Sequence, residues 1–165
     1  MSQNIKNRHR LKSKEIRGLV DTLEKEFGET FFDTNVAVEV GDVENNHFVF
    51  IDGQAVLMYF EDKLCFTLKG IELFKPKNRY VTVDMGAVKF VANGADVMAP
   101  GIVDSDKNIK ENDFVWICDE RNKKPLAVGF AVISGEDMIS GDKGKAVRVI
   151  HYVGDDIWGF VAKSL

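Results

Sequence analysis

Apolar positions between residues 13 and 27 repeat with the period of an α-helix. They fall at i, i+3, i+4, i+7 and i+11, which places them on one face of an amphipathic helix. Ser13 is the expected N-cap, and Gly28 is expected to end the helix. Because Gly18 inside the helix costs about 1 kcal/mol relative to Ala, we expect the helix to need tertiary packing. The apolar residues are Ile16, Leu19, Val20, Leu23 and Phe27.

Short β-branched and aromatic runs follow this helix. The pattern predicts strands at residues 36–40, 47–51, 54–60 and 64–68. Asp52-Gly53 between two of them is a strong signal for a two-residue hairpin turn. The helix and an antiparallel meander therefore form a first small domain, residues 1–76, which ends at the polar connection around Pro76. A second domain is expected over residues 77–165.

The second half of the chain alternates short strand signals with turns. Strands are predicted at residues 80–83, 114–118, 126–133 and 146–152, with a short turn of helix within 134–143. Residues 104–112 are expected to be a polar loop, and the apolar segment 157–161 follows a turn at 154–156. Many short strands with regular turns and one short helix predict a small β-barrel. The whole chain is expected to be α+β, with β-structure dominant.

The stretch from Asp84 to Gly101 combines a short helix with several glycines. Asp84 is the expected N-cap and Gly94 the expected stop, with Lys89 on the outer face of the helix. Gly86, Gly94 and Gly101 leave backbone amides uncovered, and such sites accept phosphates. The same glycines would equally allow close packing against the barrel, and the residues alone do not decide between the two.

Charge is distributed unevenly along the 165 residues, whose formal net charge is −4. Residues 1–17 carry six basic side chains and one acidic, whereas residues 18–83 carry six basic and twelve acidic. A protein that grips nucleic acid by charge alone is usually basic overall. Any contact with nucleic acid must therefore be local and depend on shape. The basic N-terminus is either a disordered, solubilising tail or part of such a contact.

Signatures of enzymes and metal sites are absent from the sequence. Two Cys and three His cannot form a zinc set, and no CxxC motif occurs. Gly141–Lys145 lacks the spacing of a phosphate-binding loop, and His151 late in a strand favours a hydrogen-bonded structural role over that of a base. We therefore expect no catalysis, no metal and no cofactor. Cys65 and Cys118 are expected to be buried free thiols.

No membrane or secretion signal is present. No apolar run approaches the roughly 20 residues that span a bilayer, and the N-terminus lacks the apolar core of a signal peptide. The expected location is the cytoplasm, with no membrane partner.

The run VDMGAVKFVANGADVMAPGI, residues 83–102, carries a family resemblance. It resembles the signature of PUA domains, RNA-binding modules named for pseudouridine synthase and archaeosine transglycosylase. The resemblance continues through Leu126–Gly129, Gly144–Ala146 and Ile150–Tyr152 to Asp156–Trp158, covering residues 79–162. It is closer still to the group of the malignant T-cell-amplified sequence protein and the N-terminal half of ligatin. The compact length suggests an archaeal-type homologue, with a pre-PUA domain before a PUA pseudo-β-barrel.

The resemblance implies a non-catalytic, RNA-binding translation factor. Members of the group act on the small ribosomal subunit and on tRNA, in initiation, recycling and reinitiation. They work with an SUI1-domain protein, which this chain would need in trans. The alternative is an RNA-binding accessory module for an enzyme that modifies tRNA or rRNA. A third possibility is a protein–protein adaptor whose groove no longer binds RNA.

The resemblance also implies where RNA would bind. Lys89 and Arg148 would contact phosphate, and the backbone of residues 94–96 would contact sugar or base edges. Basic residues of the N-terminal domain are candidates for contact with rRNA: Arg8, Arg10, Lys12, Lys14 and Arg17. The expected groove is lined by Gly86, Lys89, Asn93, Gly94, Ala95, Asp96, Pro100, Gly101, Arg148 and His151.

Overall fold

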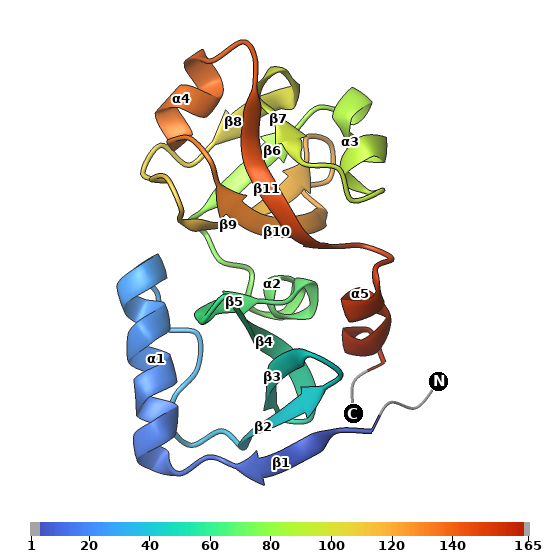
Figure 1. Cartoon of the computed structure of the whole chain (residues 1–165). Coiled ribbons are helices and arrows are strands. Elements are labelled where there is room, and N and C mark those ends of the chain that lie inside the picture. Colours follow the sequence, from blue (N-terminus) through green and yellow to red (C-terminus); the bar gives the residue numbers. More distant parts are fainter. Residues whose placement is uncertain (1–3, 164–165) are drawn as a thin grey trace. The chain divides into compact units, whose positions relative to one another are not determined.

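The computed structural model of the chain describes residues 4–163, which divide into two compact units (Figure 1). The first unit runs to Pro76 and also includes the residues from Phe160 onward. The second unit is Lys77–Gly159. The chain therefore passes from one unit to the other twice, after Pro76 and after Gly159.

The first unit is a five-stranded sheet with two helices. All neighbouring strands are antiparallel, in the order β1-β2-β3-β4-β5, which confirms the expected helix and meander. The helices are α1 (Ser13–Phe27) and α2 (Leu68–Phe74). The strands are β1 (Lys6–Arg10), β2 (Val38–Val43), β3 (Asn46–Ile51), β4 (Gln54–Phe60) and β5 (Lys63–Phe66).

Helix α1 buries the apolar stripe that the sequence predicts. Its N-cap is Lys12 rather than Ser13, and the Lys12 N–H donates to the Glu15 carboxylate at 3.1 Å. Gly28 ends the helix in the left-handed conformation, with φ of 70°. At this end the ring of Phe27 packs edge-on against Phe66 of β5, with ring centroids 5.2 Å apart. The helix is thus anchored to the sheet where its own hydrogen bonding stops.

Two tight turns set the register of the meander. Asp52 and Gly53 have φ of 51° and 82°, and Glu61 and Asp62 have φ of 49° and 63°. Positive φ at both central residues is the pattern of the type I′ turn, whose twist matches that of antiparallel strands. The hairpin expected at Asp52-Gly53 is confirmed: Ile51 pairs with Gln54.

Strand β1 is the main difference from the expected first unit. Every residue of β1 is exposed, yet the strand pairs with β2 through Lys6↔Asp42 and His9↔Val40. Pairing with β2, rather than burial of side chains, orders this segment. The alternative of a disordered tail is therefore wrong for residues 6–10. The pairing also shifts the strand expected at residues 36–40 to Val38–Val43.

Helix α2 replaces the end of the strand expected at residues 64–68. The buried Thr67 hydroxyl accepts the Gly70 N–H at 3.1 Å and donates to the Ala55 carbonyl at 2.7 Å. A Cβ at Gly70 would lie 2.1 Å from the Val56 carbonyl oxygen, so only glycine allows the helix to lie this close to β4. This long-range contact leaves no signal in local periodicity.

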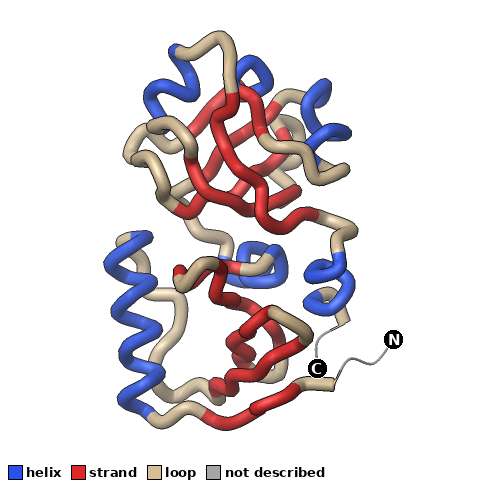
Figure 2. Tube along the Cα trace, viewed as in Figure 1, coloured by secondary structure: helices blue, strands red, loops and turns tan. Residues whose placement is uncertain are grey.

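The second unit is a six-stranded sheet that forms a nearly closed barrel with short helices around it (Figure 2). The strand order is β7-β11-β10-β9-β6-β8, in which β6 and β9 are parallel and the other neighbours antiparallel. The helices are α3 (Met85–Val91), the 3₁₀ turn η1 (Ala99–Gly101) and α4 (Gly135–Ser140). The strands are β6 (Tyr80–Val83), β7 (Val97–Met98), β8 (Ile102–Ser105), β9 (Phe114–Asp119), β10 (Pro125–Ala131) and β11 (Lys145–Tyr152). The predicted barrel with a short helix is confirmed.

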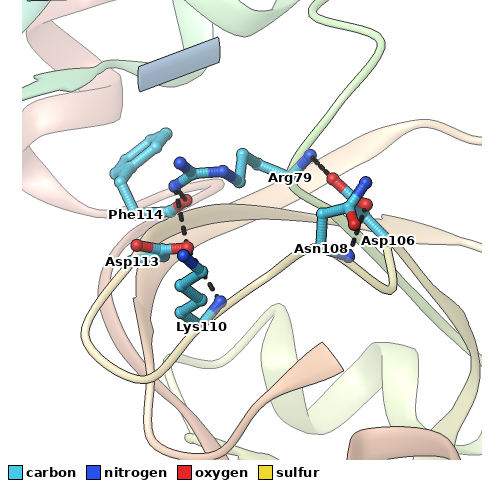
Figure 3. A network of polar contacts seen from close by, with 6 residues as sticks. All are labelled: Arg79, Asp106, Asn108, Lys110, Asp113 and Phe114. Atoms are coloured by element: carbon cyan, nitrogen blue, oxygen red, sulfur yellow. Dashed lines mark hydrogen bonds and ion pairs between the residues drawn. The ribbon is translucent and has the colours of Figure 1, made fainter. Parts of the chain in front are cut away.

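A polar network fixes the loop between β8 and β9 at the start of the second unit (Figure 3). The Arg79 N–H donates to the Asp106 carboxylate at 2.7 Å, and the Arg79 guanidinium lies 3.3 Å from the Asp113 carboxylate. Asp106 also accepts the Asn108 N–H, and Asp113 accepts the Lys110 N–H. The polar loop expected here is therefore tied at both ends to the residue that precedes β6.

The last helix, α5 (Asp156–Val161), returns the chain to the first unit. The Phe160 ring packs against Phe48 and Phe50 of β3, with ring centroids 5.0 and 6.1 Å apart. A ring of α5 therefore packs against the core of the first unit.

Both cysteines are free and buried, as expected. Burial raises the pKa of the Cys65 thiol to about 12 and raises the pKa of Cys118 as well. A thiol reacts as its thiolate, so neither sulfur is activated. In residues 4–163, no helix combines the length and the apolar character that crossing a membrane requires.

We predict that neither thiol reacts readily in the native protein. At pH 8, a disulfide reagent that releases a coloured thiol should react with both cysteines in seconds after denaturation, and with native protein only as fast as it unfolds. Absorbance over time measures the two rates. Rapid labelling of one native thiol would contradict the burial of that cysteine.

Candidate functional site

Helix α3 is held at both ends by short local contacts. Asp84 is the N-cap, and its side chain accepts the Ala87 N–H at 2.8 Å. The Asp84 N–H donates to the Gly101 carbonyl at 2.9 Å, which joins the start of the helix to η1. Beyond the helix, Gly94 takes φ of 90°, and the Ala95 N–H donates back to the Phe90 carbonyl at 3.0 Å. The segment is therefore a closed loop from β6 to β8 with the helix inside it.

The amides at the start of α3 are already occupied by carboxylates. Besides the contact of Ala87 with Asp84, the Met85 N–H donates to the Glu120 carboxylate at 2.8 Å. Two negative charges at this helix end disfavour a phosphate there. The Met85 and Ala87 N–H groups are therefore not open to a phosphate, and acceptance of phosphate near Gly86, Gly94 and Gly101 stays a prediction.

Close packing accounts for two of the glycines. A Cβ at Gly101 would lie 2.9 Å from the Ala87 Cβ, and one at Gly94 would lie 2.7 Å from the Tyr152 ring. Gly94 also needs its positive φ, which an L-residue rarely adopts. The alternative that these glycines allow segments to pack closely is thus supported by their neighbours.

A groove of about 580 Å³ lies between α3, η1 and β7. Its surface is largely apolar, because Phe90 and Met98 are 59% and 49% exposed and both line it. Ala87 and Val91 of α3 contribute further apolar surface. Five of the residues expected from the sequence line this groove: Gly86, Ala95, Asp96, Pro100 and Gly101.

Asp96 connects the two sides of the groove. Its carboxylate accepts the Val149 N–H from β11 at 2.9 Å and forms an ion pair with Lys145 at 2.9 Å. Partial burial would raise the pKa of Asp96, but the contacts with Lys145 and Val149 and the nearby charge of Arg148 lower it below its usual value. Asp96 is therefore a structural anion that also places the Lys145 ammonium at the groove.

The other expected groove residues lie beside the groove rather than in its lining. Lys89 is exposed, and its ammonium lies 5.3 Å from the centre of the Phe90 ring. The Asn93 amide donates to the Lys89 carbonyl at 2.9 Å, so it stabilises the end of α3. Arg148 is exposed on β11 and lies 5.4 Å from the Phe130 ring. Lys89, Lys145 and Arg148 thus supply three exposed cations around an apolar surface.

His151 is not at the surface. Its side chain is fully buried, and its Nδ1 lies 3.0 Å from both carboxylate oxygens of Asp155. A ligand in the groove cannot reach this ring, so the expected contact of its side chain with RNA is corrected to a structural role. Asp155 also accepts the N–H groups of Tyr152 and Trp158, and so forms the turn that leads into α5.

The groove expected from the sequence did not include Phe90, Met98 or Lys145. Phe90 does not share the helix face of Val88 and Val91, and it is exposed. An aromatic residue on the outer face of a short helix was the signal that could have identified it. Met98 pairs with Lys145 between β7 and β11, which are distant in sequence. That pairing could not be identified from the local pattern.

The basic residues of the N-terminal segment lie together in the first unit. Arg8 and Arg10 belong to β1, and the Arg8 guanidinium forms an ion pair with Glu39. The other candidates are Arg10, Lys12, Lys14 and Arg17, and all four are exposed. Within residues 4–163, none of these four takes part in an ion pair. Over the same residues, no group of three or more His, Cys, Asp or Glu side chains is placed to hold a metal ion.

Comparison with known proteins gives a family match for the second unit and relatives for most of the chain. The family model described as the PUA domain matches residues 79–153. An uncharacterized protein of Methanocaldococcus jannaschii is 41% identical over 158 residues, which are 94% of this chain and 98% of that protein. A hypothetical protein of Pyrococcus horikoshii has a crystal structure with a TM-score of 0.84 at 34% identity, covering 93% of this chain and 99% of that one.

Two eukaryotic relatives match over part of their length. Translation machinery-associated protein 20 of Saccharomyces cerevisiae is 31% identical over 116 residues, which are 67% of this chain and 64% of the yeast protein. Malignant T-cell-amplified sequence 2 of Homo sapiens is 28% identical over 121 residues, which are 70% of this chain and 66% of the human protein. The chain thus aligns with about two thirds of each of these relatives.

We predict that the buried His151–Asp155 pair contributes strongly to stability. Asp155→Ala leaves a buried imidazole and two backbone N–H groups without their acceptor, which should cost about 3 kcal/mol at pH 7. The exposed neighbour Asp156 provides a matched control, and Asp156→Ala should cost less than about 0.5 kcal/mol. Urea unfolding followed by circular dichroism measures both changes.

The pH dependence of the same loss follows from the pKa of Asp155. Burial would raise it, but the hydrogen bonds from His151, Trp158 and Tyr152 lower it below its usual value. The unfolded chain therefore binds the proton first as pH falls, and the stabilisation by Asp155 is lost below about pH 4. The difference between wild type and Asp155→Ala should shrink there. A constant difference from pH 7 to pH 3 would contradict the role of the carboxylate charge.

Proposed function

Because the chain belongs to the PUA-domain proteins related to the malignant T-cell-amplified sequence proteins and translation machinery-associated protein 20, we propose that it is a non-catalytic RNA-binding factor of translation. It acts on the small ribosomal subunit, on tRNA or on both, in initiation, recycling or reinitiation. RNA binds at the groove between α3, η1 and β7, with contacts from β11.

The observation that carries this proposal is an exposed apolar groove surrounded by cations in an acidic protein. Phe90 and Met98 present large apolar surfaces to solvent in the groove. Lys89, Lys145 and Arg148 lie beside them, although the chain as a whole has a net charge of −4. Apolar surface next to positive charge suits a ligand whose flat bases alternate with phosphates.

The groups divide the contacts between base and phosphate. The Phe90 ring offers a face for stacking, which is worth about 1–3 kcal/mol per base. Lys89 lies next to this ring, so a phosphate adjoining the stacked base would reach its ammonium. The carboxylates of Asp84 and Glu120 keep phosphate away from the start of α3. In the proposed complex, a base therefore enters the groove and phosphates follow its outer edge.

Overall charge supports an RNA with an unpaired segment rather than a plain duplex. With a net negative charge, long-range attraction is weak, and affinity depends on local contacts. Sequence-specific recognition of RNA uses splayed bases of loops, bulges and ends. Small-subunit rRNA and tRNA both offer such bases, in agreement with the translation names of the eukaryotic relatives.

We predict that Lys89→Glu weakens binding of tRNA or of small-subunit rRNA. Loss of one phosphate contact should lower the slope of log affinity against log salt by about one, and reversal of the charge should reduce affinity by about tenfold or more. Lys107→Glu is the control, since Lys107 is exposed in the β8–β9 loop outside the groove lining. Filter binding at four salt concentrations measures both. Equal affinities and equal slopes for wild type and Lys89→Glu would exclude this site.

Assembly in the cell is tested by sedimentation of the same variants in a lysate. Association of wild type with small subunits, and its loss in Lys89→Glu, supports a role on the ribosome. A stable complex with an RNA-modifying enzyme instead would support the accessory-module alternative. An SUI1-domain protein acting in trans is part of the proposal and should co-sediment with the wild-type complex.

A further inference from the structure

A second pocket lies in the first unit, and none of its lining residues lines the groove. Its volume is about 560 Å³, and its lining comes from β1, α1, β2, β3, β4 and the turn after β4. The apolar part of the lining is Leu11, Leu19 and Val40, of which the last two are almost fully buried. Such a surface can cover the hydrocarbon stem of a long side chain.

Two aromatic rings form part of the pocket lining. His47 of β3 and Tyr59 of β4 are directly paired across the sheet, with ring centroids 5.4 Å apart and planes tilted by 41°. Both are open to solvent: Tyr59 is 38% exposed, and the His47 side chain is 42% exposed. The face of a tyrosine ring carries partial negative charge, so an exposed face attracts a cation.

The His47 ring is oriented by a carboxylate beside the pocket. Its Nδ1 contacts the Asp42 carboxylate, which also accepts the Asn7 amide from β1 at 2.8 Å. The hydrogen bonds from Asn7 and His47 lower the pKa of Asp42, so this side chain is negatively charged at neutral pH. Negative charge therefore lies next to the pair of rings.

Apart from histidines, the charged side chains that line the pocket are both acidic. Glu15 comes from the first turn of α1, and Asp62 from the turn after β4. Both are exposed, and within residues 4–163 Asp62 takes part in no ion pair. Lys63 follows Asp62 but pairs with Phe60, which places it on the face of the sheet opposite Tyr59. Two carboxylates at one opening attract a cation and repel an anion.

The arginines of β1 lie on the other face of the sheet. Successive side chains of a strand point to opposite faces. His9 pairs with Val40, and both line the pocket. Arg8 and Arg10 therefore lie on the opposite face, where Arg8 forms an ion pair with Glu39. They do not offset the negative charge of the pocket lining.

The cations of α1 also face away from the pocket. Successive residues of an α-helix are turned by about 100° around its axis. Leu19, four residues after Glu15, is therefore turned by only about 40° from it, and both line the pocket. Lys14 is turned by about 100° from Glu15, and Arg17 by about 160°. Among the described residues, no Lys or Arg belongs to the lining.

Exposed rings, two carboxylates and an apolar floor together suit an arginine side chain. The guanidinium is planar, stacks on aromatic faces, and has five N–H donors for carboxylates. The ammonium of lysine is a strongly hydrated point charge that does not stack in this way. The methylene groups of arginine can lie on the apolar floor while the charged end stays at the opening.

We propose that this pocket docks an arginine from a basic segment of a protein partner. The guanidinium stacks on Tyr59 and His47 and donates hydrogen bonds to Glu15 and Asp62, and its stem lies along Leu19. An arginine within a peptide suits the site better than the free amino acid, because the free α-carboxylate is repelled by the acidic lining. The chain's net charge of −4 also favours a basic partner. This inference goes beyond the proposed function and does not rest on RNA binding.

The test is titration of the ¹⁵N-labelled full chain with N-acetyl-arginine amide, which presents arginine as a peptide does. Amide chemical shifts should change most at residues 9–15, 47 and 59–62. The citrulline derivative has the same shape without the charge, and it should bind about tenfold more weakly. The lysine derivative and free arginine should also bind more weakly than N-acetyl-arginine amide.

Two pairs of variants test the ring and the carboxylate. Tyr59→Leu keeps apolar bulk but removes the aromatic face, and it should weaken binding by about 3-fold to 30-fold, whereas Tyr59→Phe should stay within about twofold of wild type. Asp62→Asn should weaken binding by about twofold to fivefold. Asp21→Asn is the control for the lost charge, since Asp21 is exposed on α1 on the side away from Leu19. The amide spectrum of each variant shows whether it is folded.

Several outcomes would overturn the inference. Equal binding of the arginine and citrulline derivatives, or no shift at the pocket with either, would mean that the pocket does not recognise the cation. Tighter binding of free arginine would identify an amino-acid site instead of a protein-docking site. Shifts at the pocket with an oligoadenylate but not with N-acetyl-arginine amide would make RNA the occupant. In each case the proposed function is decided separately, by Lys89→Glu in the second unit.

Discussion

The groove of the second unit depends on one carboxylate. Asp96 lies in the short segment between α3 and β7, and it accepts the Val149 N–H and the Lys145 ammonium of β11. Without these contacts, only two residue pairs would join β7 to β11. The same ion pair places a cation next to the apolar surface of Met98. The half-buried Asp96 carboxylate therefore joins the segment before β7 to β11 and holds part of the positive charge at the groove.

The proposed RNA-binding groove has to bind an anionic ligand in a chain whose net charge is negative. An acidic chain cannot attract RNA over long distances, because its net charge repels phosphate. The second unit instead places a cation beside an exposed aromatic ring, with the Lys89 ammonium 5.3 Å from the centre of the Phe90 ring. Stacking contributes affinity that salt does not screen, and the cations position the RNA backbone through its phosphates. This division favours unpaired bases over the regular backbone of a duplex.

Local patterns predicted the elements whose stability is itself local. The stripe of α1, the turn at Asp52-Gly53 and the cap at Asp84 each depend on neighbours within a few residues, and each occurs where it was expected. Strand β1 and helix α2 were missed because a ladder to β2 and a close approach to β4 create them. At the groove, the sequence identified the glycines and Asp96.

The groove residues that the sequence missed, Phe90 and Met98, are functional candidates because they are exposed. The exposure of a side chain depends on how segments distant in sequence pack. The periodicity within α3 does not reveal that β7 pairs with β11. His151 was misplaced in the groove for the same reason. Its residue type suits RNA, but its position on β11 is fully buried against Asp155.

The first unit is built from two stretches of the chain that are far apart in sequence. Phe160 packs on Phe48 and Phe50, so the two stretches meet at these rings although the whole barrel lies between them in sequence. Contacts between residues more than 100 positions apart carry a larger loop-closure entropy than local contacts. Hydrogen bonds of Asp155 with His151 and Trp158 form the turn that leads β11 into α5. Because the first unit also includes the residues from Phe160 onward, a boundary drawn at Pro76 alone would separate the sheet from a ring that packs on Phe48 and Phe50.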